Sequence, residues 1–226
     1  MEKILAAALC LVFAAAPSQA QQILCITDVT IIDAAYSEPR PGMTVTVTDG
    51  LIADVVAAGG ARVPEGATVI DGSGRYLIPG LWDSHVHLSF GGAEALEGLL
   101  RHGVTTVRDM GSALPDVRCW RAAVREGKLD GPRILTSGPA IESGRFIDII
   151  GQVDGALDIS LGPVLLPTRV GVSDEDEAAS TVRDLRDEAV DFVKLRTVPS
   201  RPVYEAILRE AAEAGLTVAG HEPLVV

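Results

Sequence analysis

Apolar and polar residues alternate in short runs along the first part of the chain. Residues 43–48 (MTVTVT) alternate apolar side chains with Thr, Asp49 and Gly50 follow as a hairpin turn, and LIADVV resumes the pattern. A third strand is expected at residues 67–70, before an Asp-Gly-Ser-Gly turn. The pattern predicts a small β-rich module within residues 21–79.

Beyond Gly80 the pattern changes to strands that alternate with helices. Strands are expected at residues 81–88, 104–109, 133–137, 191–196 and 217–220, and helices at 93–102, 115–126, 174–189 and 200–215. Ser173 is expected to cap the acidic turn that opens the third of these helices. Residues 138–172 are rich in Gly and Pro and show no clear period, so the pattern assigns no element there.

Repeated strand–helix units predict a parallel sheet, either an open doubly wound sheet or a (β/α) barrel. No GxGxxG fingerprint and no phosphate-binding loop follows any expected strand, which disfavours a nucleotide-binding sheet. The chain has 226 residues, 47% of them hydrophobic, enough for one domain or for one domain and a fragment. Its formal net charge of −12 argues against nucleic acid or an anionic membrane as a partner.

The first twenty residues have the composition of a secretory signal peptide. An apolar stretch from Ile4 to Ala16 precedes the small-x-small cleavage signal Ser-Gln-Ala, whereas a membrane anchor needs roughly 20 apolar residues. We therefore expect a secreted or periplasmic protein with no membrane association after the signal peptide is removed. Cys25 and Cys119 could then pair in an oxidising compartment, although two separately buried thiols fit their places in a strand and a helix better.

Residues with metal-binding or catalytic chemistry fall late in the expected strands: His85, His87, Asp109, Lys194 and His221. In a barrel, functional residues gather at the C-terminal ends of the strands, and alternate residues such as His85 and His87 share one face of a strand. Each has a structural alternative. The histidines could be core residues, and Lys194 could extend to solvent. His102, at the end of an expected helix, is interpreted as structural.

Four motifs in order, IPGLWDSHVHL, VTTVRDMG, DFVKL and VAGHE, resemble the amidohydrolase superfamily, in particular its imidazolonepropionase-like and prolidase-like branch. The resemblance runs from about Ile23 to His221. It implies an α/β fold: a metal-dependent (β/α)8 TIM-type barrel and a small β-sandwich assembled from both chain ends. We therefore expect the N-terminal part of that sandwich in residues 21–79 and a partial barrel, with about five of eight strands, in residues 80–226.

The resemblance also implies roles for single residues. His85 and His87 resemble the first-strand ligands of one metal, and His221 resembles the fifth-strand ligand of a second. Lys194 resembles a fourth-strand lysine that is carboxylated in many members and bridges the two metals, most simply two Zn²⁺. Asp109 matches a strand-end Asp that would support the ligands without touching metal. Such a site would activate a water to attack an amide, peptide or cyclic amide.

The chain departs from the family pattern after His221. The family carries a metal-binding His on the sixth strand and a metal-binding, general-base Asp on the eighth, and neither lies within these 226 residues. Residues 138–172 also lack a His-Gly element of some relatives. We expect the N-terminal portion of a secreted amidohydrolase that acts on a small molecule or short peptide. An open barrel edge would favour self-association or a homo-oligomer. Two alternatives stay open: a non-catalytic exported binding protein, and a degenerate relative that has lost its chemistry.

Overall fold

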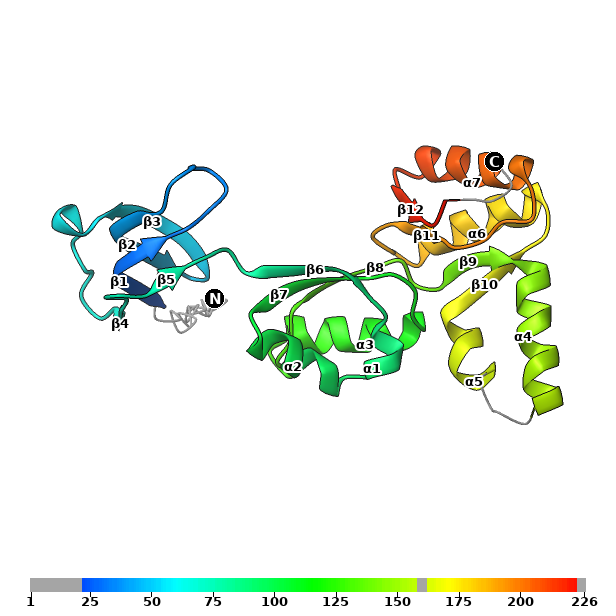
Figure 1. The fold of residues 1–226 in the computed structure, drawn as a ribbon, viewed down its shortest axis with the longest axis horizontal. Helices are drawn as coiled ribbons and strands as arrows, with labels where there is room; N and C mark the ends of the chain where they lie inside the picture. The colour runs from blue at the N-terminus through cyan, green and yellow to red at the C-terminus, as the bar shows by residue number, and fades with distance from the viewer. Residues whose placement is uncertain (1–21, 158–161, 223–226) are drawn as a thin grey trace, which may run out of the picture. The chain divides into compact units, whose positions relative to one another are not determined.

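The computed structural model describes residues 22–157 and 162–222, and the chain divides into two compact units between Pro79 and Gly80 (Figure 1). The expected signal peptide, residues 1–20, lies outside the described residues. Each unit has its own apolar core, and each is described by itself below. No helix among the described residues has the length and apolar character needed to cross a membrane.

Unit 1 is one small sheet built from the strands β1 (Ile23–Ile31), β2 (Arg40–Thr48), β3 (Leu51–Ala57), β4 (Thr68–Asp71) and β5 (Tyr76–Leu77). The sheet order is β3-β2-β1-β4, with β5 also paired to β1. Strands β1, β2 and β3 are antiparallel, whereas β4 and β5 run parallel to β1. Asp49 and Gly50 both have positive φ, as a two-residue type I′ hairpin turn requires. A short 3-10 turn, η1 (Ala58–Gly60), follows β3.

Successive side chains of β1 and β2 point to opposite faces of the sheet, and those on one face form the core of unit 1. Val29, Ile31 and Val45 are buried together, while Thr side chains of β2 occupy intervening positions. Cys25 is also buried, but Cys119 in unit 2 is exposed and both thiols are free. The expectation of two separately buried thiols is therefore wrong for Cys119, which lies on the solvent side of its helix.

The described residues of unit 2 contain seven strands that pair in parallel: β6 (Leu81–Val86), β7 (Val104–Asp109), β8 (Arg133–Thr136), β9 (Ala140–Ser143), β10 (Arg169–Val172), β11 (Val193–Leu195) and β12 (Val218–Gly220). Its helices are α1 (Leu88–Gly91), α2 (Glu94–Arg101), α3 (Leu114–Arg125), α4 (Gly144–Leu157), α5 (Gly162–Leu165), the 3-10 turn η2 (Leu166–Thr168), α6 (Glu175–Asp187) and α7 (Arg201–Glu213). Parallel strands that alternate with helices confirm the α/β fold class.

The strands form two sheets, β6-β7-β8 and β10-β9-β11-β12, that follow one another along the chain. Strand β8 belongs to the first sheet and β9 to the second, and only residues 137–139 (Ser-Gly-Pro) separate them along the chain. Asp191 bridges the break, because its backbone N–H donates to the Thr136 carbonyl at 2.9 Å and its carboxylate accepts from the Thr136 N–H at 2.8 Å. The sheets are not closed, as expected for part of a barrel.

Residues 138–172, which the sequence pattern leaves unassigned, form β9, α4, α5, η2 and β10 apart from residues 158–161, which are not described. Strand β10 pairs with β9 on the side opposite β11. This strand is an addition that the strand–helix alternation does not predict.

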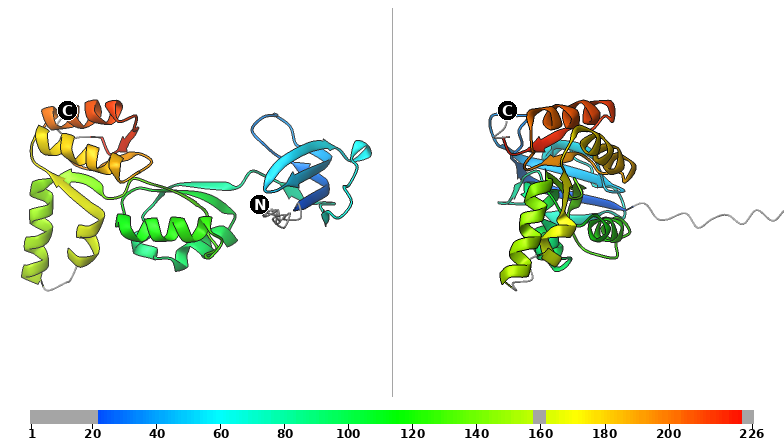
Figure 2. Two further views of the ribbon diagram at one scale, coloured as in Figure 1. Left: turned by 180° about the vertical axis from the view of Figure 1, so that it is seen from behind. Right: turned by 90° about the vertical axis from the view of Figure 1, so that its right-hand side faces the viewer.

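Helices α2 and α3 cover one face of the first sheet, and α6 and α7 cover one face of the second, whereas Ile147 of α4 packs against Gly171 on the second sheet's other face (Figures 1 and 2). Leu96 of α2 and Val117 of α3 pack on Val107 and Ile134 of the first sheet. On the second sheet, side chains of α6 and α7 pack against Ile141, Val193 and Leu195, including Val182, Leu185, Ala206 and Ile207. The other face of the second sheet is where the next residues along β9 and β11 project, namely Glu142 and Lys194.

Helix α6 begins differently from the expectation. Its N-cap is Asp174 and not Ser173, because the Asp174 side chain accepts a hydrogen bond from the Glu177 N–H at 2.9 Å. The Glu177 carboxylate in turn accepts from the Ser173 N–H at 2.9 Å. This reciprocal arrangement satisfies two backbone donors at the helix start.

Candidate metal centre

His85 and His87 lie at the C-terminal end of β6, and their imidazole rings are neighbours. The ring centroids are 5.3 Å apart with an interplanar angle of 61°. His85 is within the strand, whereas His87 is in extended conformation just after it, as the N-cap residue of α1. The Asp83 carboxylate accepts a hydrogen bond from the His85 N–H at 3.1 Å, which shapes the irregular end of the strand.

The ring of His87 has a defined orientation. Its Nδ1 is 3.0 Å from the Gly111 carbonyl oxygen, so in the neutral ring Nδ1 carries the proton and donates to that carbonyl. The other ring nitrogen, Nε2, then keeps its lone pair. A backbone carbonyl that fixes one ring nitrogen while the other stays free is the arrangement commonly found for histidines that bind metals.

Asp109 lies at the end of β7 and is completely buried. Its carboxylate accepts hydrogen bonds from the Leu88 N–H at 3.1 Å, the Ser112 hydroxyl at 2.6 Å and the Thr136 hydroxyl at 2.7 Å. Burial raises the pKa of Asp109, although these hydrogen bonds act in the opposite direction. By holding Leu88, the carboxylate fixes the backbone directly after His87.

Lys194 is in the middle of β11, and only 2% of its surface is exposed. The side chain therefore does not extend to solvent. Burial lowers the pKa of Lys194, and the positive charge of Arg108 lowers it further. The same lysine charge, after burial, lowers the pKa of His85. A lowered pKa favours the neutral amine, which is less costly to bury than an ammonium group.

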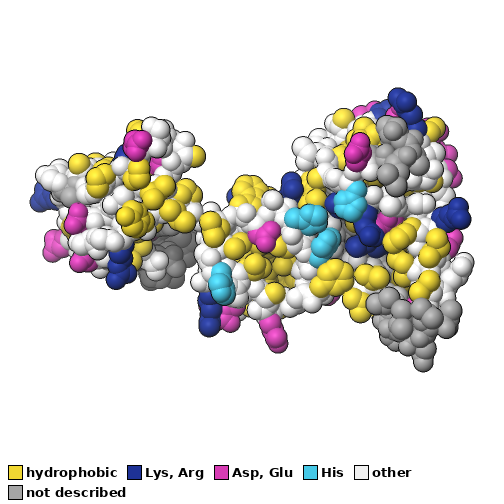
Figure 3. Space-filling view, in the orientation of Figure 1, with side chains coloured by type: hydrophobic (Ala, Val, Ile, Leu, Met, Phe, Trp, Pro, Cys, Tyr) yellow, Lys and Arg dark blue, Asp and Glu magenta, His cyan; other side chains and the backbone are white. Residues whose placement is uncertain are grey.

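His221 directly follows β12 and is exposed. Its N–H donates to the Leu195 carbonyl at 3.1 Å, which extends the pairing of β11 with β12 by one residue. Partial loss of water around the ring lowers the pKa of His221, and the positive charge of Lys194 lowers this pKa further. His221 also contributes to the lowered pKa of His85. Histidine side chains gather beside lysine and arginine side chains on one face of unit 2 (Figure 3).

These residues offer part of a metal site. Within residues 22–157 and 162–222, no group of three or more His, Cys, Asp or Glu side chains is close enough to hold one ion. The structure brings together the His85 and His87 rings and places Lys194 and His221 near them, without assembling a third imidazole or carboxylate into the pair. Two imidazoles and a buried amine fit a borderline metal such as zinc, with further ligands needed to complete its shell.

The sequence patterns missed a charged cluster beside Lys194. Glu142 is fully buried, and its carboxylate accepts from Arg196 Nη1 at 2.8 Å and from the Thr197 hydroxyl at 2.6 Å. Arg169 Nε lies 3.4 Å from the same carboxylate. Glu142 and Arg169 lie in the stretch without a clear period. A usable signal for Arg196 was its place two residues after Lys194, just beyond the end of β11, because alternate residues of an extended segment share one face.

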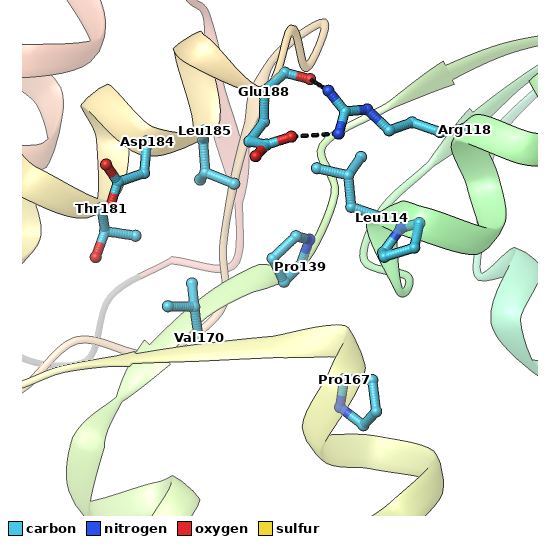
Figure 4. A pocket seen from close by; sticks show the side chains of 10 residues that line it. Leu114, Arg118, Pro139, Pro167, Val170, Thr181, Asp184, Leu185 and Glu188 are labelled. Atoms are coloured by element: carbon cyan, nitrogen blue, oxygen red, sulfur yellow. Dashed lines mark hydrogen bonds and ion pairs between the residues drawn. The ribbon is translucent and has the colours of Figure 1, made fainter.

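Two other features lie apart from these residues. His102 is the C-cap residue of α2, and its Nδ1 is 2.7 Å from the Gly98 carbonyl oxygen, consistent with a structural role. A cavity of about 370 Å³ lies beside α6, on the face of the second sheet that α6 and α7 cover (Figure 4). Leu114, Val170 and Leu185 line it, and an ion pair between Arg118 and Glu188 borders it. None of the expected metal ligands lines this cavity.

Similarity to known proteins agrees with this geometry. The amidohydrolase family matches residues 76–222, which is more than half of the chain. An imidazolonepropionase from Caulobacter sp. (strain K31) is 29% identical over 184 residues, covering 76% of this chain and 42% of that protein. An adenine deaminase from Paracoccus denitrificans (strain Pd 1222) is 40% identical over 73 residues, covering 31% of this chain and 12% of that protein.

Solved structures give the same result. Phenylurea hydrolase B superposes with a TM-score of 0.76 and 28% identity, over 89% of this chain and 55% of that chain. A putative prolidase from Bifidobacterium longum superposes with a TM-score of 0.70 and 25% identity, over 88% of this chain and 49% of that chain. The chain thus spans about half of each structure and less than half of each curated relative named above. It belongs to the amidohydrolase family.

Proposed function

We propose that this protein is a metal-dependent hydrolase that cleaves the C–N bond of an amide, a peptide or a cyclic amide. The observation that carries the proposal is that the His85–His87 pair, at the C-terminal end of β6, lies within electrostatic reach of the buried Lys194 of the parallel strand β11. Membership of the amidohydrolase family supports hydrolysis of C–N bonds as the reaction class. The substrate is a small molecule or a short peptide.

The proposed metal ligands are His85, His87, Lys194 and His221, and the proposed metal is zinc, with two ions in a complete site. When bound, the ions would polarise the scissile carbonyl and activate a water molecule. The chain's own residues prepare this chemistry. The Gly111 carbonyl keeps the His87 proton on Nδ1, and Asp109 holds the backbone that follows His87.

We propose that Lys194 is carboxylated. Its lowered pKa favours the neutral amine, which adds to the carbon of CO₂ and releases a proton to give a carbamate. The product replaces a buried cation by an anion with two oxygen donors, and the guanidinium groups of Arg108, Arg169 and Arg196 nearby would stabilise that anion. Mass spectrometry of the intact protein under CO₂-buffered conditions should show the added mass in the wild type and not in Lys194→Met.

Hydrolysis assays test the reaction class. When the sixth-strand His and the eighth-strand Asp of the family pattern are present in the same protein, zinc-supplemented protein should hydrolyse at least one member of a panel of dipeptides, N-acyl amino acids and cyclic amides. His87→Ala should lower kcat/KM by about 100-fold or more, since removing even a group that supports a metal ligand costs about 10–100-fold. His102→Ala serves as the matched control and should keep full activity. Hydrolysis that survives His87→Ala or a chelator would contradict the proposal, as would failure to hydrolyse every substrate class.

We also propose that the protein is exported and that residues 1–20 are removed. The support is the apolar stretch followed by Ser-Gln-Ala in the sequence. N-terminal sequencing of the protein from the producing cell should find Gln21 as the first residue. Recovery of a chain that still begins with Met1 would contradict this proposal.

Self-association through an open sheet edge is the proposed mode of assembly. Among the described strands, β12 pairs only with β11, which leaves its other edge without a partner strand. An unpaired edge is a template for pairing with another chain. Sedimentation velocity should show a dimer or larger species that increases with protein concentration, and a monomer at every concentration would contradict it.

A further inference from the structure

Positive charge is in excess around Lys194. The charges of Arg108, Arg169 and Arg196 all act on this lysine, and the carboxylate that opposes them is Glu142. A site with more positive than negative side chains favours an anionic ligand.

Glu142, Arg169 and Arg196 lie on the same face of the second sheet as Lys194. Ile141 and Leu195 pack into the helix-covered core, so Glu142 and the lysine, one residue away on each strand, project from the opposite face. Arg196 follows Lys194 by two residues and shares this face. Arg169 of β10 pairs with Ala140 of β9 and shares its face. Glu142 follows Ala140 by two residues, so it lies on the same face as Arg169.

The two arginines share one carboxylate. Glu142 Oε1 accepts from Arg196 Nη1 at 2.8 Å and lies 3.4 Å from Arg169 Nε, while Oε2 accepts from Thr197 at 2.6 Å. Arg169 Nη1 also donates to the carbonyl and hydroxyl oxygens of Thr168, both at 2.8 Å. Each guanidinium has five N–H donors, so one shared carboxylate leaves donor capacity on both.

Arg169 is fixed beside a proposed metal ligand. Its side chain is only 7% exposed, and it lies against Gly111. A methyl group at Gly111 would lie 3.2 Å from Arg169 Nη1 and 3.6 Å from His87 Nδ1. One small residue therefore separates the guanidinium from the imidazole. The Arg196 side chain is 35% exposed and stacks on Phe146, with Cζ 5.1 Å from the ring centroid, so it remains open to a ligand from solvent.

We propose that Arg169 and Arg196, held by Glu142, form a carboxylate-binding subsite beside the metal ligands. The subsite selects amide substrates that carry a free carboxylate close to the scissile C–N bond, such as N-acyl amino acids or dipeptides. Planar guanidinium groups can grip a carboxylate with paired, charge-assisted hydrogen bonds, which a neutral amide cannot form equally well. This inference rests on the proposed function, because it names the substrate class of the same site.

A binding experiment tests the subsite without requiring turnover. Calorimetric titration of the zinc-supplemented protein would compare N-acetyl-L-alanine with N-acetyl-L-alaninamide, which differ only in the carboxylate. The wild type should bind the carboxylate about tenfold or more tightly than the amide. Arg169→Met and Arg196→Met should each reduce this preference to about twofold or less, and Arg196→Lys should recover part of it.

Arg201→Met is the matched control. Arg201 is an exposed arginine on α7 that pairs with Glu205, so its loss should leave the preference unchanged. Arg196→Met keeps the test decisive if the more buried Arg169→Met fails to fold, as judged by circular dichroism. Equal affinity for both probes, no measurable binding of either, or a preference that survives in Arg196→Met would overturn the inference.

The outcome is distinguishable from a failure of the proposed function. A carboxylate preference that depends on Arg196, in a protein that hydrolyses none of the amide panel, would retain the subsite and reject the reaction class. Metal-dependent hydrolysis of neutral and carboxylate substrates with equal kcat/KM would retain the reaction class and reject the subsite.

Discussion

Asp109 links the first sheet to the backbone that positions His87. Its carboxylate is completely buried and accepts hydrogen bonds from Leu88, Ser112 and Thr136, which belong to three different parts of unit 2. Burial opposes ionisation, and the hydrogen bonds only partly offset that cost, so the pKa of Asp109 stays above its ordinary value. The protein thus keeps a costly buried carboxyl group at the base of the proposed metal site.

Asp109→Asn should therefore change how stability depends on pH. A carboxyl group whose pKa is raised by folding contributes stability that is fully present below its unfolded pKa and is lost as pH rises through its folded pKa. The free energy of unfolding of the wild type, relative to Asp109→Asn, should fall as pH rises above about 4, the ordinary pKa of an aspartate. Urea unfolding of both proteins at each pH measures this difference. A difference that is constant or increases with pH would contradict the raised pKa.

Gly111 is a second residue on which the site depends. Its φ of +133° is one that side chains rarely adopt, and an added Cβ would crowd Arg169 and Ala140, both at 3.2 Å. Gly111→Ala should destabilise the protein by more than Gly127→Ala, a control with φ of +67° and no neighbour within 4 Å of its Cβ position. Zinc affinity, measured by titration, should fall in Gly111→Ala only. Equal effects of the two substitutions would show that the crowding is unimportant.

Single residues differ in how far the sequence predicts them. Spacing alone predicted His85 and His87 on one side of a strand end, since alternate residues of a strand share a face. The alternative that Lys194 extends to solvent is wrong, because only 2% of its surface is exposed. The Glu142–Arg196 pair could not be predicted, because it depends on the pairing of β9 with β11 across more than fifty residues. The ligand roles of these residues and the supporting role of Asp109 remain predictions.

At the scale of elements, helix α6 shows how local sequence determines a boundary. Asp174 caps the helix through the Glu177 N–H. Asp174→Ala should lower the free energy of unfolding by about 1 kcal/mol, the usual cost of losing such a cap. Asp176→Ala, in the same exposed first turn, loses a favourable interaction with the helix dipole of about 0.3 kcal/mol. Urea unfolding compares the two, and an equal loss in both variants would refute Asp174 as the cap.

Elements with a clear period were predictable, and those without one were not. The helices that became α2, α3, α6 and α7 each show an apolar face, which is buried on a sheet. The described residues of 138–172, which exclude 158–161, form a strand, helices and a second strand, but β9 and β10 are four residues each and directly follow Gly-Pro or the 3-10 turn η2. Strands this short carry too few residues for alternation to stand out, and the pairing of β10 with β9 stabilises them instead.

At the scale of the whole molecule, the two units have separate cores. Val45 is buried in the core of unit 1, and Ile207 is buried beneath the second sheet of unit 2. Ile207→Ala should destabilise unit 2 by about 2–5 kcal/mol. Hydrogen exchange by mass spectrometry should show faster exchange in α7 and β11 with no change in β1 and β2, and Val45→Ala should give the reverse. Faster exchange throughout both units in either variant would contradict independent cores.

Bound zinc, counted per chain, tests the proposed metal centre most directly. Elemental analysis after dialysis should find about one zinc ion or more in the wild type and in His102→Ala, whose histidine lies at the end of α2. The double variant with His85→Ala and His87→Ala should lose this zinc, and Lys194→Met should hold less than the wild type. Equal zinc content in the double variant and in the wild type, or no zinc in any of them, would contradict a metal site built on β6.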